Sequence, residues 1–305
     1  MIEAERETDM NERIPTANEM YFSELNADAS QMERLEKQFF QSVGLPNGTW
    51  KTTTHRRLGN LNDLVQKFLP AERPLDVMDV AVSSGVSTVE WVESMERAGI
   101  QCRMTAGDAT ADAYLVSIAP GLRVLVDRHG HALQYEVAGR GIGRPLRKRL
   151  MPLYLWPVLF IHLVLWLVVA PALAVATRLE DGGRLGTRWR PLKLVSPTLR
   201  KRNRIDVVED DILVNRSYRG CFHAVRAANI LNRGYFDDST LNAMLTNLRN
   251  RLKTGGLLIV CRTNIQNVNN GTIFQLREDG RLHVLERLNE GSEVEQLALA
   301  LPPRI

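Results

Sequence analysis

The chain has 305 residues, of which 44% are hydrophobic and 24% charged, a composition that indicates a folded globular protein and excludes a disordered one. The three cysteines lie far apart and show no CxxC spacing, so the sequence predicts reduced thiols, with neither a disulfide framework nor a metal site. The formal net charge of +4 hides an asymmetry: residues 140–204 contain 14 Lys/Arg and 2 Asp/Glu, whereas the rest of the chain is net acidic.

Residues 1–73 are predicted to form a polar, helical N-terminal cap. The first 15 residues are acidic and lack an apolar run, so they predict no secretory signal and a cytoplasmic location. Apolar side chains at helical spacing predict one helix over 30–46 and another over 61–70. Such a cap is either a plain structural cover or a lid over a cofactor, in which residues 54–57 (Thr-His-Arg-Arg) would meet a carboxylate.

An α/β pattern begins at residue 74. Apolar runs predict strands at 75–82, 100–108, 205–214, 221–231 and 257–263, with helices at 87–99 and 239–256 between them. Alternating runs predict antiparallel hairpins over 122–137 and 271–288. Helices that alternate with apolar strands predict a mainly parallel sheet covered on both faces, with an antiparallel hairpin at one edge.

Four of the predicted strands end in residues that suit a nucleoside ligand, and parallel sheets bind ligands at that edge. The turn from Asp79 to Thr88 leads a strand into a helix N-terminus, where backbone N–H groups can approach an anion. Asp108 ends the next strand and can accept from both hydroxyls of a ribose. Residues 209–212 (Glu-Asp-Asp-Ile) offer a carboxylate to an adenine amino group, and residues 227–229 (Ala-Ala-Asn) leave room for reacting groups.

The same stretches resemble the class I S-adenosylmethionine-dependent methyltransferases over 74–305, leaving out an insertion. VMDVAVSSGVST is similar to the first motif of that family, AGDAT carries its ribose acid, and VVEDDIL is similar to its adenine-edge motif. FHAVRAANILNRGYF is similar to the fourth-strand motif of the chemotaxis-receptor methyltransferase branch. The resemblance implies a Rossmann-like fold, S-adenosyl-L-methionine as cofactor, and a set of cofactor-binding residues: Asp79, Ala81, Ser83, Gly85, Asp108, Asp211, Ile212, Ala228 and Asn229.

The sequence departs from the family at Ala81 and Ser83, where glycines are usual. Ala81 fits the turn if its φ is negative, but either side chain would crowd the methionine moiety. A catalytically silent homologue is therefore the alternative to an enzyme. The Rossmann oxidoreductase alternative is disfavoured, because it requires GxGxxG after the first strand.

Residues near the fourth strand are the candidates for contact with a methyl acceptor. Tyr235 follows the strand end and is the preferred candidate, whereas His223 lies early in the strand and suits a structural role better. Asp237 is a further candidate, and the sequence assigns no general base.

The stretch 139–204 is predicted to be a membrane-associating insertion. Its core, 150–177, runs for 28 residues without Asp, Glu, Lys or Arg and is flanked by basic residues. A single crossing would divide the sheet between two sides of the membrane, and 28 residues are too few for two crossings, which need ~40. A re-entrant or interfacial segment on the cytoplasmic face satisfies both limits. A buried core helix is the alternative, and nucleic-acid binding is disfavoured because the aromatic residues lie in the apolar run.

These observations predict four parts: a cap (1–73), the first half of a methyltransferase domain (74–138), the insertion (139–204) and the second half (205–305). The predicted function is membrane-associated, S-adenosylmethionine-dependent methyl transfer to a lipid-linked or amphipathic acceptor. The alternative is a silent methyltransferase-fold scaffold, anchored to a membrane or a partner through the insertion.

Overall fold

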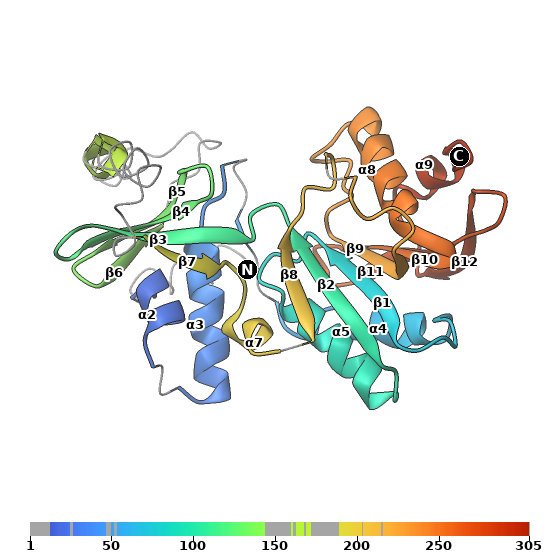
Figure 1. Cartoon of the computed structure of the whole chain (residues 1–305), viewed down its shortest axis with the longest axis horizontal. Helices are drawn as coiled ribbons and strands as arrows, with labels where there is room; N and C mark the ends of the chain where they lie inside the picture. The colour runs from blue at the N-terminus through green and yellow to red at the C-terminus, as the bar shows by residue number, and fades with distance from the viewer. Residues whose placement is uncertain are drawn as a thin grey trace. The chain divides into compact units, whose positions relative to one another are not determined.

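The chain folds into two compact units, which are drawn in Figure 1. The computed structural model describes residues 13–24, 27–46, 50–51, 54–143, 160, 163–167, 169–171, 189–202, 204–214 and 216–304. The first unit combines Met1–Thr53 with Asp112–Pro197, and the second combines Thr54–Ala111 with Thr198–Ile305. Each unit is built around a sheet of its own.

A seven-stranded sheet forms the centre of the second unit. Its strands are β1 (Leu75–Val80), β2 (Cys102–Asp108), β8 (Ile205–Glu209), β9 (Phe222–Ala228), β10 (Leu252–Thr263), β11 (Asn269–Leu276) and β12 (Leu282–Leu288). They lie in the order β12-β11-β10-β9-β1-β2-β8, and the last five of these run parallel. Strands β11 and β12 form the antiparallel edge hairpin. Numbered along the chain within this sheet, the order from β8 is 3-2-1-4-5-6-7, which begins as the doubly wound Rossmann order does.

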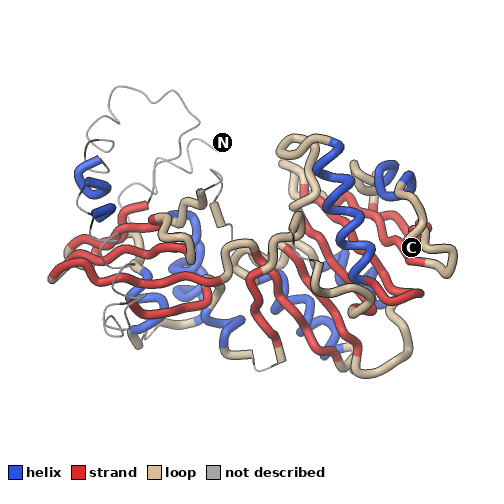
Figure 2. Tube along the Cα trace, turned by 45° about the horizontal axis from the view of Figure 1, so that its top comes forward, coloured by secondary structure: helices blue, strands red, loops and turns tan. Residues whose placement is uncertain are grey.

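Helices cover both faces of this sheet, as Figure 2 shows. They are α4 (Gly59–Gln66) and α5 (Val86–Arg97) on one face, and α8 (Asp238–Arg251) and α9 (Glu295–Ala300) on the other. Apolar side chains of α8 pack on alternate residues of the central strands to form a core in which Leu241, Leu245 and Val225 are fully buried. The prediction of an α/β fold with a mainly parallel sheet and an edge hairpin is therefore confirmed.

The first unit has an antiparallel sheet that the sequence did not predict as a separate body. Its strands are β3 (Asp112–Ala119), β4 (Leu122–Asp127), β5 (Ala132–Val137), β6 (Arg140–Gly143) and β7 (Trp189–Lys193), in the order β6-β5-β4-β3-β7. Helices α2 (Ala17–Phe22) and α3 (Ala29–Ser42) cover one face, where Phe39 and Phe40 are fully buried.

This sheet moves the boundaries that the sequence predicted at 73, 138 and 204. The predicted hairpin over 122–137 forms as β4 and β5, but it pairs with β3 and not with the seven-stranded sheet. The cap is divided as well, because α2 and α3 pack on the first unit and α4 belongs to the second. The insertion therefore runs from Asp112 to Pro197 and includes a folded sheet.

Most of the apolar segment 150–177 lies outside the described residues. The residues of it that are described, 160, 163–167 and 169–171, are helical. Val169 is buried against the second face of the antiparallel sheet, together with Val124 and Trp189. Among the described residues, no helix is long and apolar enough to cross a membrane.

Candidate functional site

The carboxyl ends of the parallel strands meet around β1, which lies between β2 and β9. The chain order of the strands reverses here, and doubly wound sheets bind their ligands at such a point. The turn that follows β1 has left-handed backbone at alternate residues: Ala81 has φ 54°, Ser83 φ 57° and Gly85 φ 80°. The condition under which Ala81 would fit this turn, a negative φ, is therefore not met. A side chain in this region costs about 1–2 kcal/mol because Cβ crowds the backbone.

Two neighbours fix this turn. Gly85 has a φ of 80°, and a Cβ there would overlap a terminal methyl group of Leu199 in helix α7 (Pro197–Arg200), so both the backbone and the packing favour glycine. On the other side, the N–H of Ser83 donates to Oδ2 of Asp108 at 2.8 Å, and the N–H of Thr110 donates to Oδ1 at 3.0 Å. Asp108 thus joins the end of β2 to the turn after β1.

Asp79 is buried and faces the interior of the second unit. Its Oδ1 accepts from Nε of Arg226 at 3.0 Å, and its Oδ2 accepts from Nη2 at 2.5 Å and from the hydroxyl of Thr88 at 2.7 Å. Arg226 is fully buried and stacks on Trp91, with its guanidinium carbon 4.4 Å from the ring centroid. Sequence reasoning missed Arg226, although the parallel register pairs it with Asp79. Because both carboxylate oxygens of Asp79 accept hydrogen bonds from Arg226 and Thr88, Asp79 stabilises the protein interior next to the turn.

The three residues after β8, Asp210, Asp211 and Ile212, lie in different environments. Asp210 is buried and forms a two-pronged ion pair with Arg251, with distances of 2.6 and 3.0 Å. Asp211 is exposed, and its Oδ1 accepts from the N–H of Leu213 at 2.8 Å. Ile212 is buried in the core beneath α8. Asp211 therefore lies where the sequence predicted an adenine contact, whereas Ile212 is part of the protein core and its predicted packing on the ring has no support in this structure.

Asn229 follows Ala228 at the end of β9 and has a positive φ of 63°. Its side-chain oxygen accepts from the N–H of Thr263 at 2.7 Å. The Thr263 hydroxyl donates to Asn269 at 2.7 Å, and the Asn269 amide donates to the carbonyl of Arg57 at 2.7 Å. This chain of hydrogen bonds ties residue 57 to the ends of β9 and β10. The amide nitrogen of Asn229 is buried and has no partner among the described residues, so it can donate to a ligand.

Arg57, a positively charged residue, lies near the same strand ends, because its carbonyl accepts a hydrogen bond from Asn269. Its side chain is half-buried, and burial, together with the charge of Arg226, lowers the pKa of its guanidinium. Its Nε is buried without a partner among the described residues. Glu90 accepts from the N–H of Arg56 at 2.6 Å and so holds this segment on α5. Nearby, burial raises the pKa of the Cys261 thiol to about 11, which leaves it uncharged.

The three candidates for acceptor contact lie in different environments. Tyr235 is 70% exposed in the segment after β9. His223 is the second residue of β9, near the amino end of that strand, and its Nε2 is 3.0 Å from a carboxylate oxygen of Glu72. Asp237 caps α8, and hydrogen bonds from Thr240 hold the pKa of its carboxyl below the usual value. Tyr235 and Asp237 are both exposed after the carboxyl end of β9, but Asp237 is engaged in capping α8.

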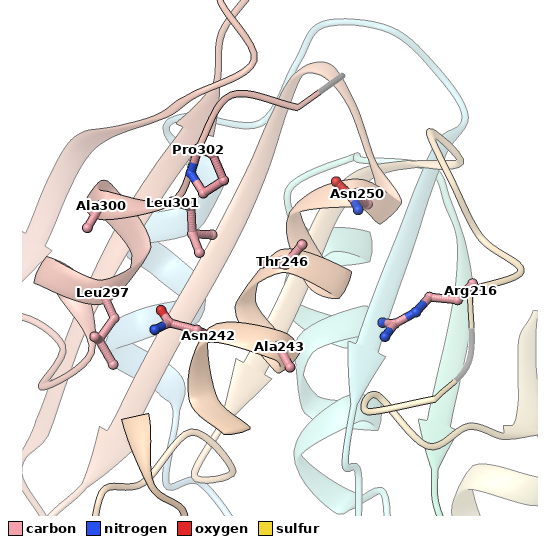
Figure 3. Close-up of a pocket in the computed structure, with 9 residues that line it drawn as sticks. All are labelled: Arg216, Asn242, Ala243, Thr246, Asn250, Leu297, Ala300, Leu301 and Pro302. Atoms are coloured by element: carbon pink, nitrogen blue, oxygen red, sulfur yellow. The ribbon is translucent and has the colours of Figure 1, made fainter. Parts of the chain in front are cut away.

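A groove of about 560 Å³ lies away from these strand ends, over the outer surface of α8 (Figure 3). Asn242, Thr246 and Asn250 line it from α8, and Leu297 and Leu301 line it from α9 and the residue after it. None of the predicted site residues contributes to it.

The comparisons with known proteins give distant structural likenesses. No protein-family model matches the sequence, and no curated protein matches it. An O-methyltransferase family protein from Burkholderia thailandensis has 14% identity and a TM-score of 0.31, with 69% of this chain and 39% of that chain covered. Phosphoethanolamine N-methyltransferase 2 of Haemonchus contortus, in complex with S-adenosyl-L-methionine, has 11% identity and a TM-score of 0.30, with 67% and 28% covered.

A third similar structure is the [4+2]-cyclase SpnF, with 13% identity, a TM-score of 0.30, and 67% and 44% covered. This chain therefore spans less than half the length of each of these three proteins. Because the TM-scores are near 0.3, the fold assignment rests on the strand order of the sheet itself.

Proposed function

We propose that the second unit binds S-adenosyl-L-methionine at the carboxyl ends of β1, β2, β8 and β9 and transfers its methyl group to an acceptor. The observation that carries this proposal is the turn at residues 81–85, where left-handed residues alternate and Asp108 holds the N–H of Ser83. Such a turn lets the backbone come close to a ligand, and the neighbouring Asp108 carboxylate supports a contact with a ribose.

The residues around the turn fit the parts of this cofactor. Asp108 would accept from the ribose hydroxyls, and Asp211 from the adenine amino group. Arg57, whose buried Nε has no partner among the described residues, would bind the methionine carboxylate. The Asn229 amide nitrogen, which likewise has no partner in the described part of the chain, would donate beside it. Two buried donors without partners are costly in an empty site, about 1–3 kcal/mol each, and a ligand acceptor removes that cost.

The cofactor supplies a methyl group on a sulfonium. The protein's part is to align the acceptor with that methyl group and to exclude water from the reacting atoms. We assign Tyr235 to acceptor contact, since it is exposed beyond β9. An acceptor that is lipid-linked or amphipathic, presented at the cytoplasmic face of a membrane, suits the 28-residue uncharged segment with its basic flanks.

Calorimetric titration with S-adenosyl-L-methionine tests the cofactor assignment. Asp108→Asn is expected to weaken binding by at least about tenfold, because a charged acceptor of two hydroxyl hydrogens becomes a neutral group. The matched control is Asp206→Asn, which changes an exposed carboxylate within β8 and away from the strand ends. Absence of binding to the unmodified protein, or equal binding by both variants, would refute the assignment.

A second candidate function is a silent scaffold on the same fold. The observation that favours it is the positive φ of Ala81 and Ser83, because each carries a side chain into a turn that glycine suits better. Transfer of label from methyl-labelled S-adenosyl-L-methionine to native lipid extracts separates the two candidates. Cofactor binding without any labelled product in the extract would favour the scaffold.

A further inference from the structure

A short apolar helix in the first unit packs on the antiparallel sheet by one side. Val169 is 1% exposed among the valines of β3 and β4, and Leu165 packs against the same cluster. These two residues are four apart, so they lie on the same side of the helix. Figure 1 shows this helix in yellow-green at the sheet of the first unit.

The opposite side of the helix presents large apolar side chains to solvent. Phe160, Leu163, Val164 and Leu167, termed the outer stripe, have the spacing i, i+3, i+4, i+7 and point about half a turn away from Leu165 and Val169 at ~100° per residue. Their exposed fractions are 65%, 51%, 42% and 56%, and the neighbouring Trp166 is 56% exposed. A surface helix normally turns polar residues outward, so a contiguous apolar stripe marks a contact surface.

The charged residues on either side of this helix in the sequence indicate what the helix contacts. Residues 140–149 contain five Lys/Arg and no acid, and residues 184–193 contain four Lys/Arg and no acid. An anionic lipid surface attracts such flanks, and tryptophan concentrates at the boundary between headgroups and acyl chains. A helix that lies in this boundary need not be long enough to cross the bilayer.

We propose that the outer stripe docks on the surface of an anionic lipid bilayer, with Leu163 and Leu167 entering the acyl region. This inference deepens the membrane association proposed above, on which it rests, but it does not depend on methyl transfer. The opposite face of the helix stays on the antiparallel sheet, so docking requires no rearrangement of Val169.

Flotation of the full chain with phosphatidylglycerol vesicles and with phosphatidylcholine vesicles tests the proposal. The unmodified protein should float with the anionic vesicles, and 1 M salt should weaken that binding by screening the basic flanks. Leu163→Glu/Leu167→Glu should reduce it by at least about tenfold. The matched control, Ile265→Glu, changes a 95% exposed apolar side chain of the second unit and should float as the unmodified protein does.

Three further measurements distinguish a loss of lipid binding from unfolding or from a change in oligomeric state. The double variant should keep the melting temperature and the S-adenosyl-L-methionine affinity of the unmodified protein, because its substitutions lie on the exposed side of a helix in the other unit. Light scattering should give both proteins the same mass in the absence of lipid. Equal binding to neutral and anionic vesicles, retained flotation of the double variant, or a dimer that the double variant dissociates would each overturn the proposal.

Discussion

At the scale of single residues, the turn after β1 combines an unfavourable backbone with favourable neighbours. Ala81 and Ser83 adopt a conformation that their side chains disfavour, and they do so next to Asp108, which binds the N–H of Ser83. Such strain persists only where the surrounding structure enforces it, and it concentrates at functional sites. Here β1, β2 and α7 meet around the turn, so the fold enforces this conformation.

The backbone of the turn leads to a stability prediction. Ala81→Gly should raise the free energy of unfolding by up to about 1 kcal/mol, because relief of the left-handed strain exceeds the extra flexibility of glycine in the unfolded chain. Urea denaturation measures the change. The control is Ala98→Gly, at an exposed position with φ −83°, where glycine should lower the free energy of unfolding by about 0.5 kcal/mol. Stabilisation by both substitutions, or by neither, would contradict the strain at Ala81.

At the scale of elements, the ion pair of Asp79 and Arg226 holds β1, β9 and two helices together. Besides Asp79, Arg226 donates to Asn62 of α4 at 2.9 Å and to the carbonyl of Ser87 of α5 at 2.9 Å. This ion pair could not be predicted from the sequence, because the residues next to an arginine in an apolar strand do not indicate which carboxylate it will bind. Only the register between β1 and β9, which are separated by more than a hundred residues, brings the two charges together.

Breaking this pair should cost far more than breaking an exposed one. Arg226→Met leaves Asp79 buried and unpaired, and it should lower the free energy of unfolding by about 3–5 kcal/mol. Arg103→Ala removes an exposed partner of Asp76 and should cost less than about 1 kcal/mol. Thermal unfolding followed by circular dichroism distinguishes these magnitudes. The double variant Asp79→Leu/Arg226→Met should recover most of the loss, since it leaves no unpaired charge in the core.

At the scale of the whole molecule, the sequence predicted one sheet well and did not predict the other as a separate body. Strands β1, β2, β8, β9 and β10 follow from local apolar runs bounded by turns, so the ends that carry Asp108 and Asn229 were placed correctly. The antiparallel sheet depends on pairing between β3 and β7, which a long apolar stretch separates. No local pattern reveals such a pairing. The excess of basic residues over 140–204 did set this part of the chain apart from the rest. It led to the prediction of a membrane segment and did not indicate a folded sheet.

The division into units predicts a minimal cofactor-binding protein. Residues 54–111 joined to 198–304 by a flexible Gly/Ser linker retain every strand of the parallel sheet, together with Leu199, Arg57 and the Asp79–Arg226 pair. In the shortened chain the linker only connects β2 to β8. Because the entropy of closing a loop changes slowly with its length, replacing residues 112–197 by a linker should alter the stability of the sheet little. The shortened chain should therefore unfold cooperatively, as small single domains do. It should bind S-adenosyl-L-methionine within about threefold of the full chain and should no longer float with anionic vesicles. An insoluble product, or a soluble one without a cooperative transition, would show that the parallel sheet needs the first unit in order to fold. Cofactor binding by the residues around the turn would then have to be measured in the full chain.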